Sequence, residues 1–152
     1  MMGNGSNDKL DAKDLRERLV QSALAWQHAF SNAPAITSAL SEYDAAMRLG
    51  MTPDEYSASM QGVTAVQEGY DFRFKGKRYQ VKANRPSGKP GSRVTLVAKA
   101  RNYKWDYLVW VLYNCQYEVQ EVWLWERSKY EELFHAKKRL SPKDYRQGTQ
   151  LP

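Results

Sequence analysis

The sequence contains a single cysteine, Cys115, so the chain can form no internal disulfide and no zinc site of four thiolates. It also lacks any apolar stretch approaching the ~20 residues that a membrane-spanning helix needs. Residues 1–8 are polar and lack the basic and then apolar pattern of a secretory signal. We therefore expect a soluble protein of a reducing, cytoplasmic compartment.

Acidic residues are missing from one long segment. Residues 72–105 contain eleven lysines and arginines and no aspartate or glutamate, whereas the remaining residues carry 12 basic and 17 acidic side chains. Concentrated positive charge attracts polyphosphates. The segment therefore predicts a nucleic-acid-binding face, and the alternative is a solvated basic surface without a partner.

A chain of 152 residues is long enough for one ordinary domain. We expect a flexible N-terminus over residues 1–10, a single domain over 11–140 and a C-terminal tail over 141–152. Apolar residues recur at three- and four-residue spacing over 11–30, where Leu15, Leu19, Ala23, Trp26 and Phe30 form one face. Further helices are predicted over 38–49 and, after a capping box that begins at Thr52, to about residue 60.

The pattern changes to that of strands after residue 62. Aromatic and polar residues alternate over 70–75, and an almost continuous apolar run over 107–113 is typical of a central strand covered on both faces. The order predicts an α/β (α+β) fold with a central mixed sheet flanked by helices. The other expected elements are strands over 63–67, 78–83, 94–97 and 117–125, a loop over 84–92 and a helix over 128–137.

Four side chains are expected to converge. If the chain turns at residues 76–77, Asp71 on one strand faces Lys82 on the next, and Gln80 lies one diagonal step away. Gln80 and Lys82 are two residues apart, so they share one face of the strand. Glu42 would come from a helix packed beside this sheet, although Asp44 or Glu55 could take its role. Glu68 is a further candidate for a nearby acid.

This set suits metal-dependent cleavage of a phosphodiester. Mg²⁺ prefers oxygen ligands, commonly one or two carboxylates with waters and substrate phosphate, and Mn²⁺ can substitute for it. Asp71 is the natural ligand, Gln80 can add a carbonyl oxygen, and Glu42 can bind directly or through water. Lys82 can activate the attacking water or stabilise the charged transition state.

The stretches around Glu42, Gly69-Tyr70-Asp71-Phe72 and Tyr79-Gln80-Val81-Lys82-Ala83 resemble the PD-(D/E)xK nuclease superfamily, which includes many restriction endonucleases. The resemblance implies a restriction-endonuclease-like core in which Asp71 and Gln80 bind Mg²⁺, Lys82 assists the water and Glu42 is the helical acid. Tyr70 replaces the usual proline. The crossover helix of the family is reduced to at most a short helix over 98–103.

Candidate contacts to DNA phosphates follow the proposed catalytic strand. They are Arg85, Lys89 and Arg93 on the loop, with Arg101 and Lys104 beyond it. The sequence thus predicts a Mg²⁺-dependent DNA endonuclease, expected to act as a homodimer when both strands are cut. The alternatives are a non-catalytic nucleic-acid-binding module on the same fold, or a phage or anti-restriction module that binds a protein through residues 118–132.

Overall fold

The computed structural model describes residues 11–61 and 69–152 and divides the chain into two units, Met1–Ile36 and Thr37–Pro152. The strand predicted over 63–67 and the candidate acid Glu68 lie outside the described residues. Among the helices that are described, none has the length and apolar character needed to cross a membrane.

The first unit contains helix α1, Ala12–Phe30, which begins after the N-cap Asp11. The apolar residues of α1 differ in their burial. Val20 and Ala23 are buried, but Trp26 is 52% exposed and Phe30 is 62% exposed. The predicted helix is confirmed, and the large apolar side chains of its predicted face lie on a different line of the helix from Val20.

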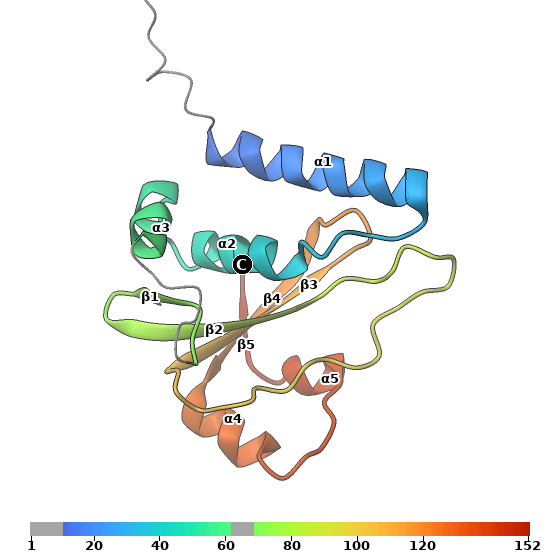
Figure 1. The fold of residues 1–152 in the computed structure, drawn as a ribbon. Helices are drawn as coiled ribbons and strands as arrows, with labels where there is room; N and C mark the ends of the chain where they lie inside the picture. The colour runs from blue at the N-terminus through green and yellow to red at the C-terminus, as the bar shows by residue number, and fades with distance from the viewer. Residues whose placement is uncertain (1–10, 62–68) are drawn as a thin grey trace, which may run out of the picture. The chain divides into compact units, whose positions relative to one another are not determined.

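The second unit is a five-stranded mixed sheet with four helices among its described residues (Figure 1). The strands lie in the order β1-β2-β3-β4-β5, and β2 and β3 form the parallel pair, whereas the other neighbours are antiparallel. The mixed sheet confirms the predicted fold class. The elements are α2 Thr37–Arg48, α3 Pro53–Met60, β1 Phe72–Phe74, β2 Lys77–Asn84, β3 Tyr107–Tyr113, β4 Val119–Glu126, α4 Arg127–Phe134, α5 Pro142–Tyr145 and β5 Thr149–Leu151.

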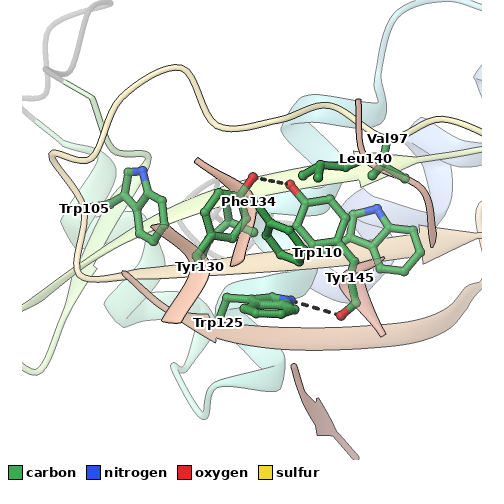
Figure 2. Close-up of a cluster of buried hydrophobic side chains, with 9 residues drawn as sticks. Val97, Trp105, Trp110, Trp125, Tyr130, Phe134, Leu140 and Tyr145 are labelled. Atoms are coloured by element: carbon green, nitrogen blue, oxygen red, sulfur yellow. Dashed lines mark hydrogen bonds between the residues drawn. The ribbon is translucent and has the colours of Figure 1, made fainter. Parts of the chain in front are cut away.

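Helices cover both faces of this sheet. Figure 1 shows α2 along one face, where it packs on β2 and β3, and α4 and α5 on the other. Beneath α4 and α5 lies a cluster of aromatic side chains, drawn in Figure 2, that includes Trp110, Trp125, Tyr130 and Tyr145. Four consecutive residues of β3, from Leu108 to Val111, are buried, which confirms β3 as a central strand covered on both faces.

The hairpin that carries the candidate site turns one residue earlier than predicted. Lys75 and Gly76 have φ of 49° and 77°, which are the two positive values of a type I′ turn. Phe72 therefore pairs with Tyr79, so Asp71 lies across from Gln80 rather than Lys82. The shift of two residues along β2 preserves the face on which Gln80 and Lys82 point.

The crossover from β2 to β3, residues 85–106, contains no helix, so the short helix that the sequence allowed at most over 98–103 does not form. The strand expected over 94–97 is reduced to one bridge, between Val97 and Leu140. Side chains from α4 and α5 hold the crossover in place instead. The Tyr130 hydroxyl accepts a hydrogen bond from the backbone N–H of Ala100 at 3.0 Å, and the Tyr145 hydroxyl donates to the carbonyl of Ala98 at 2.7 Å.

The C-terminal residues expected to form a tail are part of the sheet and its core. A capping box between Ser141 and Asp144 starts α5, and β5 then pairs with β4 as an edge strand. Tyr145 of α5 is fully buried. Elements of three or four residues show no periodicity, so the sequence pattern could not predict them.

Replacing Tyr145 with phenylalanine should destabilise the protein by about 1–3 kcal/mol, because it removes a buried hydroxyl and leaves the Ala98 carbonyl without its partner. For a chain of this size that corresponds to a melting temperature roughly 2–12 °C lower, measurable by circular dichroism. A melting temperature equal to that of the wild type would show that the crossover does not depend on this contact.

Candidate active site

Asp71 is the centre of the candidate site. It immediately precedes β1, and its Oδ2 accepts hydrogen bonds from the backbone N–H of Val81 at 2.7 Å and from the Gln80 side chain at 3.1 Å. The Asp71 N–H donates to the carbonyl of Tyr79 at 2.7 Å. The carboxylate thus accepts a backbone hydrogen bond of β2 that a neighbouring strand would otherwise accept. Both backbone and side-chain contacts hold it in position.

This position lets one carboxylate reach both faces of the sheet. Gln80 lies beside Leu108 and Lys82 beside Trp110 in the parallel pairing, so both point toward the face of the aromatic cluster. Glu42 comes from α2 on the opposite face. The two faces meet only at an edge, and Asp71 lies at that edge.

Glu42 is the helical acid that reaches Asp71, with a hydrogen bond between the two side chains. Burial, repulsion from Asp71 and this hydrogen bond together raise the pKa of Glu42 to about 8. The alternatives lie elsewhere. Asp44 accepts a hydrogen bond from the buried hydroxyl of Tyr113, and Glu55 is committed to the capping box with Thr52.

Lys82 is half-buried near the same carboxylate. Burial lowers its pKa below the ordinary value, attraction to Asp71 opposes that change, and the positive charge of Arg101 adds to it. The site therefore holds an amine that gives up its proton more readily than a surface lysine. Each of the other three side chains that the sequence singled out thus interacts with Asp71.

Tyr56 of α3 is a site residue that sequence reasoning missed. Burial and the negative charges of Glu42 and Asp71 raise the pKa of its hydroxyl to about 12. Its ring packs edge-on against Phe72, with centroids 6.2 Å apart, and against Tyr43, with centroids 5.7 Å apart. No local pattern marks this tyrosine, because its role depends on the packing of α3 against β1.

The candidate DNA-binding residues are not equivalent. Lys89, Arg93, Arg101 and Lys104 are exposed. Arg85 is committed within the chain, where its guanidinium donates to the carbonyl of Cys115 and stacks on the ring of Tyr117 with its centre 4.1 Å from the ring centroid. A phosphate contact by Arg85 would have to break these interactions.

The end of the crossover lies directly beside the site. Gly69 has a φ of +80°, and a Cβ built on it would lie 2.7 Å from the Cβ of Lys104 and 2.8 Å from the Oδ1 of Asn102. Only glycine satisfies both the backbone angle and the close approach. This packing places residues 102–104 against the segment that leads into Asp71, in agreement with the electrostatic coupling between Arg101 and Lys82.

The donor set can be compared with the needs of a divalent cation. In the described ranges 11–61 and 69–152, no three histidine, cysteine, aspartate or glutamate side chains form a metal-binding group. Mg²⁺ commonly uses only one or two protein carboxylates. A cation bound between Asp71 and Glu42 would offset the repulsion between the two carboxylates, which at present raises the pKa of Glu42. Asp71 and Glu42 therefore fit a Mg²⁺ ion.

Gln80 fits this role less directly. Its amide donates a hydrogen bond to Asp71 through Nε2, so it orients the carboxylate in this arrangement. Service as a metal ligand requires that the amide direct its oxygen toward the cation.

Comparison with known proteins does not assign the chain to a family. No family model matches the sequence, and no curated protein matches it with significant similarity.

Proposed function

We propose that the protein is a Mg²⁺-dependent DNA endonuclease of the PD-(D/E)xK type, in which Mn²⁺ can replace Mg²⁺. The observation that supports this best is the assembly of Glu42, Asp71 and Lys82 at one sheet edge, with a raised pKa at Glu42 and a lowered pKa at Lys82. Opposite shifts of an acid and a base in one small site are more typical of catalysis than of a structural ion pair.

In this proposal the chain's own groups divide the work. Asp71, held by the Val81 N–H, and Glu42 would hold the cation, which supplies charge neutralisation at the phosphate when bound. Lys82 would take a proton from the attacking water, because its lowered pKa makes the neutral amine accessible. Gln80 would keep the Asp71 carboxylate oriented.

The exposed cations of the crossover would bind the DNA backbone. Arg101 is coupled to Lys82, and Lys104 packs beside Gly69, so the basic segment begins at the candidate site itself. Such contacts position the duplex without reading its sequence. One site cuts one strand, so cutting both strands would require a second copy of the chain.

A second candidate function is a non-catalytic DNA-binding module. The observation that favours it is the orientation of the Gln80 amide. Its N–H group donates to Asp71, so its oxygen is turned away from the place where it could bind a metal ion together with Asp71. Such a module would retain binding through the exposed cations and form no cleavage products.

The test is incubation of the full chain with supercoiled plasmid in the presence of Mg²⁺, Mn²⁺ or a chelator, alongside an Asp71→Asn variant. We expect metal-dependent nicking or linearisation by the wild type and none by Asp71→Asn, since the amide removes the charge that holds the cation. The variant should still retain plasmid in a gel-shift assay.

Cleavage that survives in Asp71→Asn would contradict the proposed site. Binding by the wild type without cleavage under any metal condition would favour the non-catalytic module. Absence of both would contradict nucleic-acid function altogether.

A further inference from the structure

A second group of cations lies outside the segment that the sequence singled out. Lys137, Lys138 and Arg139 form a basic run in the turn between α4 and α5, and Lys138 and Arg139 are exposed. Lys137 is neutralised by Asp144, whose Oδ1 lies 2.8 Å from its Nζ. Within the described residues, neither Lys138 nor Arg139 belongs to an ion pair.

The structure joins this turn to the basic crossover. The Val97 N–H donates to the carbonyl of Leu140 at 3.0 Å, and Figure 2 shows these two side chains next to each other. Two residues further along, the Lys99 ammonium donates to the carbonyls of His135 and Lys137, each at 2.8 Å. Lys138 and Arg139 are therefore held next to residues 97–99.

The same crossover leads from this turn to the candidate site. Val97 and Leu140 belong to the aromatic cluster that includes Trp110, and Trp110 is the register partner of Lys82. Arg101 lies four positions after Val97, so the chain between them spans at most about 14 Å. At about 3.4 Å per nucleotide of one strand, this length corresponds to about four nucleotides of a duplex.

We propose that Lys138 and Arg139 form a second phosphate-binding patch, which holds the backbone of the same duplex DNA that enters the site at Lys82. The inference rests on the proposed function for the identity of its ligand, but not on cleavage. Two cations that belong to no ion pair within the described ranges 11–61 and 69–152, one short stretch of backbone away from Arg101, match the repeating negative charge of a DNA strand. The patch would set the position of the duplex and contribute no sequence recognition.

The experiment measures binding of the full chain to a duplex of about 25 base pairs in chelator, so that no cleavage occurs, over a range of salt concentrations. The test variant is Lys138→Ala/Arg139→Ala. The matched control is Lys13→Ala/Arg18→Ala, which removes two exposed cations from α1 and gives the same change in net charge.

The binding constant K falls as the salt concentration rises. Loss of two phosphate contacts should make the negative slope of log K against log salt concentration shallower by about 1.8 and weaken binding on the order of 10-fold near 0.15 M salt. The control should leave the slope unchanged to within about 0.3. Equal melting temperatures will show that both variants are folded. A Lys138→Gln/Arg139→Gln variant, which removes both charges but keeps polar side chains at these positions, should reproduce the loss.

An unchanged slope in the test variant, with steep salt dependence in the wild type, would overturn this inference and leave the proposed function standing. An equal decrease in the control would also overturn it, because the effect would then be one of net charge. Binding by the wild type that does not depend on salt would overturn both the patch and the proposed DNA substrate.

Discussion

Lys82→Ala is expected to lower the rate of DNA cleavage by about 10²- to 10⁴-fold, the usual contribution of one positioned acid–base group. Binding of duplex DNA should weaken by less than about 10-fold, since the exposed cations of the crossover remain. The half-buried position of Lys82 beside Asp71 places the loss in the chemical step rather than in association. Single-turnover cleavage of a labelled duplex, with protein in excess, measures that step.

Lys77→Ala is the matched control for Lys82→Ala. It removes an exposed lysine from the start of the same strand, so it changes the net charge equally and leaves the candidate site intact. Its cleavage rate should stay within about threefold of the wild type. A similar rate loss in both variants would show that Lys82 acts through charge alone.

The two roles considered for Lys82 predict different results for Lys82→Arg. Arginine remains charged at any pH used in such assays, so it can stabilise charge but cannot accept a proton from water. If Lys82 acts as the base, Lys82→Arg should be nearly as slow as Lys82→Ala. In the wild type, the cleavage rate should then rise with pH and level off above the pKa of Lys82. That pKa lies below the usual value for a lysine. Substantial rescue by arginine would assign a purely electrostatic role.

The convergence of Asp71, Gln80 and Lys82 could be predicted because it depends on local features. Strand alternation fixes Gln80 and Lys82 on one face, and a hairpin brings Asp71 back to them whether the turn is at residues 75–76 or 76–77. The predicted register was wrong because the turn type was not recognised. Lys75 adopts a positive φ, which is uncommon for lysine and so could not be predicted from the sequence.

Choice of the helical acid required the three-dimensional packing. Asp44 and Glu42 are two residues apart on α2, so they point in different directions from the helix axis. Asp44 reaches Tyr113, and Glu42 reaches Asp71. The position of Tyr56 beside the site, and that of Lys138 and Arg139 beside the crossover, depend on contacts between segments far apart in the chain. The periodicity of the sequence does not predict such contacts.

Between about pH 4.5 and 8, the free energy of unfolding of the wild type should fall as the pH rises. In the Glu42→Gln variant it should stay nearly constant over the same range. The carboxyl group has a pKa of about 8 in the folded chain, against an ordinary pKa of 4.5 for a solvated glutamate. Between these values the folded chain holds a proton that the unfolded chain has released, so rising pH favours unfolding. The stabilising contribution is complete below about pH 4.5 and is lost as the pH rises through about 8.

Glutamine reproduces the neutral acid, so Glu42→Gln should exceed the wild type in melting temperature at pH 9. Because the group is partly solvated, the full shift overstates the energy, and a difference on the order of 1 kcal/mol, or about 2–4 °C, is expected. Glu132→Gln, at an exposed position on α4, is the control and should match the wild type across the range. Thermal unfolding at pH 5, 7 and 9 makes the comparison, and a wild-type melting temperature that does not fall relative to Glu42→Gln would contradict the shared proton.

Addition of Mg²⁺ extends the same experiment to the proposed cation. A cation held by Asp71 and Glu42 binds the folded chain and replaces the shared proton, so it should stabilise the wild type more at pH 9 than at pH 5. Glu42→Gln lacks one carboxylate and should gain less from Mg²⁺ at pH 9. Equal gains in the two proteins would exclude Glu42 from the metal site, while the pH dependence without Mg²⁺ would still report its contact with Asp71.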